Sequence, residues 1–157
     1  MHSEAGTTQR RDSTVRLTRV LDVPRERAFA AWTDARQLER WFGPKGFTLH
    51  SAETDPRPGG LFRICLRSPG GEDFWVRGVY REVVAPERLV IACTAHDEKG
   101  APQLEEIISV SFTDEGGRTR LSLDATAAGS GPKAEKMMAG MPKGWNQTVS
   151  RLDEHLK

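Results

Sequence analysis

The stretch PKAEKMMAGMPKGWNQTVSRLDEHLK, residues 132–157, decides the fold of this chain. Its large apolar side chains recur every three or four residues, at Met138, Met141, Trp145, Val149, Leu152 and Leu156. Because an α-helix has 3.6 residues per turn, this spacing places all six side chains on one face. The spacing therefore predicts a long amphipathic helix in which Trp145 is buried. An apolar stripe of this length must pack against a large apolar surface, which the rest of the chain has to supply.

One proline interrupts the predicted helix. Pro142 lies inside the periodic region, with Gly140 and Gly144 on either side. Proline removes a backbone donor and clashes with the preceding turn, so we expect a short first segment to about Ala139 and a longer second one from Pro142. A bend at this point would carry the helix away from its partner surface and favour a cavity beneath it.

Alternating apolar and polar residues, separated by glycine- and proline-rich turns, predict strands that supply this partner surface. The first covers residues 14–22, and the six others cover 47–55, 61–68, 74–84, 87–95, 104–113 and 118–126. The short turns indicate antiparallel neighbours. We expect Gly78 to mark a bulge or bend. Between the first two strands, Pro24 and then Asp34 begin two short helices, with Asp34 as an N-cap.

Length and charge restrict the class of protein. A chain of 157 residues predicts one domain, here residues 14–157, after a polar tail (1–13) that we expect to be disordered. Its 23 Lys and Arg against 22 Asp and Glu argue against a nucleic-acid partner. No apolar run reaches the ~18 residues of a membrane span. The absence of a leader pattern and the two cysteines, Cys65 and Cys93, are typical of a cytoplasmic protein with reduced thiols.

Motifs of catalysis or metal binding do not occur in this sequence. It contains neither a phosphate-binding P-loop nor a nucleophile elbow. Its four histidines form no metal-ligand spacing with either cysteine. We therefore predict no catalytic residue, no metal and no cofactor.

Five segments in order resemble the activator-of-heat-shock-protein-90-ATPase-like family of the START/SRPBCC superfamily, to which the major birch pollen allergen also belongs. The segments are FAAWTDARQLERWFGP (29–44), DPRPGGLFR (55–63), GVYREVVAPERL (78–89), GRTRLSL (117–123) and GWNQTVSRL (144–152). The resemblance extends over residues 14–157. It implies an α+β helix-grip fold, in which a curved antiparallel sheet wraps around the C-terminal helix and leaves a cavity between them.

The family does not imply one chemistry, because its superfamily includes co-chaperone domains, lipid and hormone carriers and polyketide cyclases. The main hypothesis is a binding module for a small hydrophobic molecule. One alternative is a cyclase- or hydrolase-like enzyme that acts in the cavity. The other is a chaperone-cofactor-like interaction module, although we expect no counterpart of the eukaryotic co-chaperone's separate N-terminal domain within these 157 residues. The sequence leaves both a homodimer and a chaperone partner open.

Candidate ligand-binding residues come from the elements expected to face the cavity. They are Trp41, Phe42, His50, Phe62, Arg63, Trp75, Arg77, Tyr80, Glu106, Met141 and Trp145. Because an inward arginine needs a partner, we expect Arg63 or Arg77 to pair with Glu106 and to orient a ligand carbonyl or carboxylate. In the alternative interpretation, these arginines cover the outer, wet face of the sheet.

Overall fold

The computed structural model describes residues 10–157. Its elements follow the predicted order: β1 (Arg11–Leu21), α1 (Arg25–Thr33), α2 (Ala35–Trp41), β2 (Thr48–Thr54), β3 (Leu61–Arg67), β4 (Asp73–Val84), β5 (Arg88–His96), β6 (Pro102–Glu115), β7 (Arg118–Gly129) and α3 (Pro132–His155). The first strand begins at Arg11, within the segment expected to be a tail. Residues 1–9 of that expected tail lie outside the described residues.

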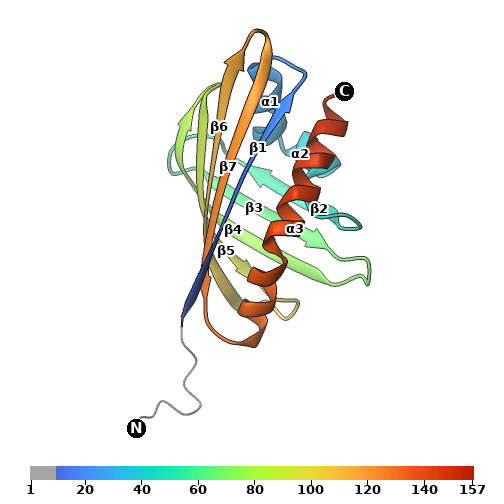
Figure 1. Cartoon of the computed structure of the whole chain (residues 1–157). Helices are drawn as coiled ribbons and strands as arrows, with labels where there is room; N and C mark the ends of the chain where they lie inside the picture. Colours follow the sequence, from blue (N-terminus) through green and yellow to red (C-terminus); the bar gives the residue numbers. More distant parts are fainter. Residues whose placement is uncertain (1–9) are drawn as a thin grey trace.

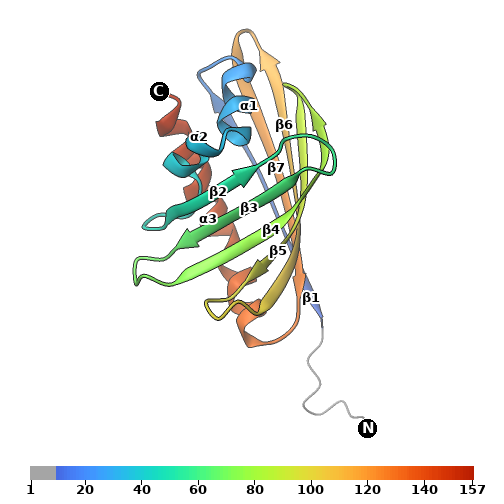
Figure 2. The same ribbon diagram turned by 180° about the vertical axis from the view of Figure 1, so that it is seen from behind.

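Within residues 10–157, seven strands form a single antiparallel sheet in the order β1-β7-β6-β5-β4-β3-β2. Helix α3 lies across the concave side of this curved sheet, and α1 and α2 lie at one end of it (Figures 1 and 2). This is the α+β helix-grip arrangement that the sequence predicts. The concave side and α3 together enclose the apolar interior.

Irregular strand pairing accompanies the curvature of the sheet. The register shifts at His50 between β2 and β3, at Arg81 between β4 and β5, and near His96 between β5 and β6. Such irregularities bend a strand and increase its twist. The expected bulge at Gly78 is therefore wrong, because the extra residue is Arg81. Gly78 instead allows close approach of β5, since a Cβ there would lie 2.0 Å from the carbonyl oxygen of Ala92.

The expected division of the C-terminal helix near Pro142 is also wrong, because α3 runs without a break from Pro132 to His155. Pro142 and Gly140 face solvent, so the proline ring displaces no side chain from the interior. Met138, Met141 and Trp145 stay buried on the sheet side. Their packing holds the helix together across the missing backbone donor. Within residues 10–157, no helix is apolar over a stretch long enough to span a bilayer.

An aromatic cluster joins the short helices to α3. Trp32 of α1 is 1% exposed, and its ring centroid lies 5.0 Å from that of Trp41 and 6.4 Å from that of Trp145. Phe42 completes the cluster at 6.0 Å from Trp32. Asp34, which ends α1, caps α2 as predicted by accepting a hydrogen bond from the backbone N–H of Arg36. The cluster and the cap together set the position of the loop that follows α2.

Candidate functional site

A cleft of about 820 Å³ lies between α3 and the concave side of the sheet. Alternation along the strands produces its apolar wall, because every second residue of β3 and β4 points inward. The loop after α2 closes one end with Phe42 and Phe47. The large apolar side chains that line the cleft are Phe42, Phe47, Phe62, Ile64, Leu66, Phe74, Val76, Ile108, Met137, Met141 and Trp145.

One carboxyl group lies on this apolar wall. Glu106 of β6 points into the cleft, whereas its neighbour Glu105 is exposed and pairs with Arg10. Burial raises the pKa of Glu106 to about 7, against the effect of its hydrogen bond with Cys93. The Cys93 Sγ donates this bond to Oε1 across 3.9 Å, and burial raises the pKa of the Cys93 thiol as well. The Glu106 carboxyl therefore keeps its proton to a higher pH than an exposed glutamate does, and in that form it can donate a hydrogen bond.

Charged residues surround the end of the cleft near the start of α3. Lys133 Nζ bonds to Asp97 Oδ2 at 3.1 Å and to Glu98 Oε1 at 2.8 Å. Asp97 is buried and also accepts hydrogen bonds from the backbone N–H groups of Lys99 and Ala101. The hydrogen bond from Ala101 is the largest influence that lowers the pKa of Asp97, to about 2. These contacts fasten the N-terminal end of α3 to the β5–β6 loop.

Five of the eleven candidate residues come together in the cleft: Phe42, Phe62, Glu106, Met141 and Trp145. Trp145 is also buried, as predicted. Trp41 and Tyr80 are completely buried in the interior but do not line the cleft. Trp41 donates a hydrogen bond from Nε1 to the Ala31 carbonyl at 3.1 Å, and Tyr80 packs edge-on against Phe62. Burial raises the pKa of the Tyr80 phenol.

The other four candidates lie outside the cleft. Arg63 pairs with Glu53, and its guanidinium lies 5.7 Å from the ring centroid of Trp75. Arg77 and His50 are exposed. The expected pairing of Arg63 or Arg77 with Glu106 is therefore wrong. The inward positions of β3 and β4 belong to even-numbered residues such as Phe62 and Val76, which leaves the odd-numbered arginines on the wet face.

Several residues of the cleft are absent from the sequence-based set. Ile64, Leu66 and Ile108 could have been found by counting in steps of two from Phe62 and Glu106. No comparable signal exists for Lys133 and Asp97, which are 36 residues apart and meet only in the folded chain. Within residues 10–157, no three His, Cys, Asp or Glu side chains are grouped so that they could hold a metal ion.

The curved antiparallel sheet, the long helix across it and the cleft between them define a helix-grip protein of the SRPBCC type. A family model described as "Activator of Hsp90 ATPase homolog 1-like protein" matches residues 22–157, and the chain belongs to this family. No curated protein sequence matches the chain.

Solved structures of similar architecture come from several bacteria. A crystal structure from Nitrosomonas europaea shares 26% identity over 92% of this chain and 94% of the other, with a TM-score of 0.73. A solution structure from Arthrobacter aurescens also shares 26% identity, over 91% and 85%, with a TM-score of 0.77. A Silicibacter pomeroyi structure named as a member of the same family is 23% identical over 92% and 97%, with a TM-score of 0.75, and supports the fold alone.

Proposed function

We propose that this chain binds a small, largely apolar ligand in the cleft between α3 and the sheet. The observation that carries this proposal is the cleft itself, about 820 Å³ in volume, with a wall of aromatic and aliphatic side chains. This volume lies within the range of pockets that enclose small organic ligands. Two methionines of α3, Met137 and Met141, contribute flexible and polarisable side chains to the wall.

Glu106 supplies the polar contribution to ligand binding. Its neutral carboxyl donates a hydrogen bond to a carbonyl or ether oxygen of the ligand, while the apolar wall excludes water from that bond. The cation expected from sequence is not beside it, because Arg63 and Arg77 lie on the other face of the sheet. The ligand class is therefore a largely apolar molecule with a carbonyl or ether oxygen that accepts from Glu106.

Filling the cleft tests the proposal. We expect Val76→Trp to weaken the binding of prodan, a neutral fluorescent probe with a ketone oxygen, by about tenfold or more, because the new indole occupies the space of the ligand. Val76 is half-buried and faces the cleft, so the larger side chain has room without displacing the interior. The measurement is a fluorescence titration of the probe.

The matched control is Val79→Trp, on the same strand but on the outer face, where Val79 is 43% exposed. This variant should bind the probe as the unchanged chain does. Equal affinity in all three proteins would place the probe elsewhere and contradict the cleft as the binding site. The same holds if the unchanged chain shows no saturable signal.

A second candidate function is acid–base catalysis in the same cleft, and the raised pKa of Glu106 favours it. As an enzyme, the chain would hydrolyse a model aryl ester such as p-nitrophenyl butyrate. Glu106→Gln would then lower kcat by about 100-fold or more. Its matched control, Glu105→Gln, changes the adjacent but outward-facing carboxyl and should leave kcat unchanged. A rate that is the same in both variants would exclude Glu106 as the catalytic group.

A further inference from the structure

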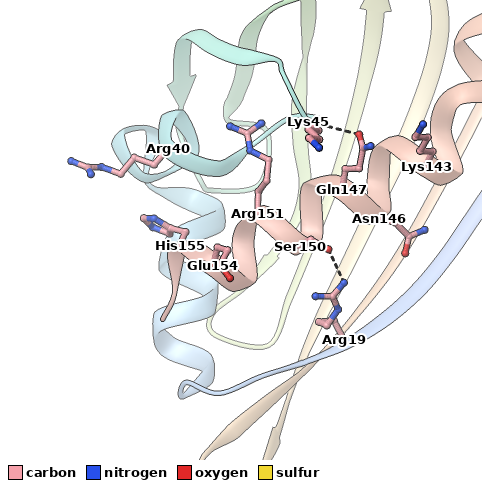
Figure 3. A pocket seen from close by; sticks show the side chains of 10 residues that line it. All are labelled: Arg19, Arg40, Lys45, Lys143, Asn146, Gln147, Ser150, Arg151, Glu154 and His155. Carbon is pink, nitrogen blue, oxygen red and sulfur yellow. Dashed lines mark hydrogen bonds between the residues drawn. The ribbon is translucent and has the colours of Figure 1, made fainter.

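A second depression, of about 810 Å³, runs along α3 and shares Lys143 and Gln147 with the lining of the cleft (Figure 3). Its walls come from α3, from Arg40 of α2 and from Lys45 in the loop after α2. Four of its cations, Arg40, Lys45, Lys143 and Arg151, form no ion pair with any carboxylate in residues 10–157. Two other charges there are already neutralised, because Arg19 pairs with Asp153 and Glu154 pairs with Lys157.

Arg151 is held in a fixed position at the centre of this depression. Its Nη1 donates hydrogen bonds to the carbonyl oxygens of Gly43, Pro44 and Phe47 at 2.8, 3.1 and 3.1 Å. The three acceptors are neutral, so the guanidinium keeps its full charge, and Nε and Nη2 have no partner within the described residues. Beside it, the backbone N–H of Lys45 donates to Gln147 Oε1 at 3.0 Å, which fixes the loop against α3 (Figure 3).

The local environment disfavours a further positive charge. The pKa of His155, whose ring lies 3.0 Å from Gln37 Oε1, is lowered first by burial and then by Arg40 and Arg27. A pre-positioned arginine in such a field, with lysines nearby, suits an anion, since Arg presents a fork of donors and Lys a point charge.

The spacing of the cations selects the kind of anion. Lys143 and Arg151 are eight residues apart, which is roughly 12 Å along the axis of α3. A single carboxylate or phosphate cannot reach both, whereas a chain of linked phosphates can. We propose that this depression binds a small ligand that carries two or more phosphate groups, either free polyphosphate or the phosphate chain of a nucleotide. Lys143 and Gln147 border both this depression and the cleft, but the other residues of the two sites differ.

The test is a titration of the full chain with sodium tripolyphosphate, followed by amide and Arg151 Nε–H NMR signals. We expect saturable shifts at Lys45, Gln147 and Arg151, and a rise in the pKa of His155 when the anion is bound. The double variant Arg40→Gln/Lys45→Gln should weaken binding by about tenfold, at two- to fivefold per exposed cation. Glu154→Gln releases Lys157 from its ion pair, which raises the net positive charge at the depression, and should tighten binding.

The matched control is Arg77→Gln/Arg81→Gln, which removes the same charge from exposed positions on β4. This control should bind tripolyphosphate as the unchanged chain does. If both double variants bind tripolyphosphate equally weakly, the effect comes from net charge alone and the proposed site is wrong. Shifts that do not saturate would also contradict the site. Saturation by a poly-glutamate peptide but not by tripolyphosphate would also overturn it.

A parallel titration with ATP and adenosine identifies the source of the phosphates. Tighter binding of ATP than of tripolyphosphate indicates a nucleotide, and equal or weaker binding indicates free polyphosphate.

Discussion

Trp32→Ala is expected to lower the free energy of unfolding by about 3–5 kcal/mol, the range for deleting a large aromatic side chain from an interior. Trp32 is 1% exposed and packs against Trp41, Phe42 and Trp145. Its removal leaves a space that rings held on three different segments cannot fill by a simple side-chain rotation. A loss of this size is a large share of the 5–15 kcal/mol that stabilises a typical domain. Urea unfolding followed by circular dichroism measures it.

Trp75→Ala is the matched control for this prediction, because it deletes the same side chain from the outer face of the sheet. Trp75 is only half-buried there, beside Arg63. We expect this variant to lose about 1 kcal/mol or less, as for one cross-strand contact. Equal losses in the two variants would contradict the central position of Trp32 in the aromatic cluster.

Glu106→Gln is expected to stabilise the protein at about pH 8 by about 1–3 kcal/mol and to leave its stability almost unchanged near pH 4. The pKa of Glu106 rises from 4.5, its ordinary value, to about 7 in the folded chain. The folded state therefore binds this proton more tightly than the unfolded state does. The stability that this proton contributes is complete below about pH 4.5 and is lost as the pH rises through 7. Glutamine stays neutral and keeps an acceptor oxygen for Cys93, so it avoids that loss.

The measurement is urea unfolding of both proteins across this pH range, with the difference in free energy taken at each pH. Taking the difference cancels the titration of every other group that the substitution does not affect. Glu105→Gln, at the adjacent but exposed position, should not reproduce the stabilisation at pH 8. A difference for Glu106→Gln that stays constant from pH 4 to pH 8 would contradict the raised pKa.

Most of the fold could be predicted from the sequence, because its signals are local. The period of 3.6 residues predicts α3, the period of two predicts the strands, and Asp34 marks the start of α2. Two of the departures from the prediction involve residues whose effect depends on their surroundings. Pro142 is tolerated because it faces solvent, and Gly78 allows β5 to approach closely rather than forming a bulge. Neither environment can be read from the residue alone.

The candidate site was less predictable. Alternation states that Arg63 and Phe62 face opposite sides, but it does not state which side is the interior. Five of the eleven candidates line the cleft, and the four on the outer face include every cation that had been chosen to pair with Glu106. The apolar members Phe42, Met141 and Trp145 could be found because the hydrophobic effect drives large apolar side chains into the interior.

The sequence by itself determined the order of the elements, the amphipathic face of α3 and the family, since each depends on residues that are close together or on the pattern of the whole chain. Only the tertiary structure decided on which face of the sheet Arg63 and Arg77 lie, how Lys133 reaches Asp97, and how Arg40, Lys45 and Arg151 come to border one depression. The physical reason is that the interactions between charges, and the loss of water around them, depend on distances between groups in the folded chain and not on their separation in the sequence. A pKa near 7 for Glu106 arises only when distant segments exclude water from its carboxyl, and the four cations border one depression only because α2, the loop after it and α3 meet in the fold.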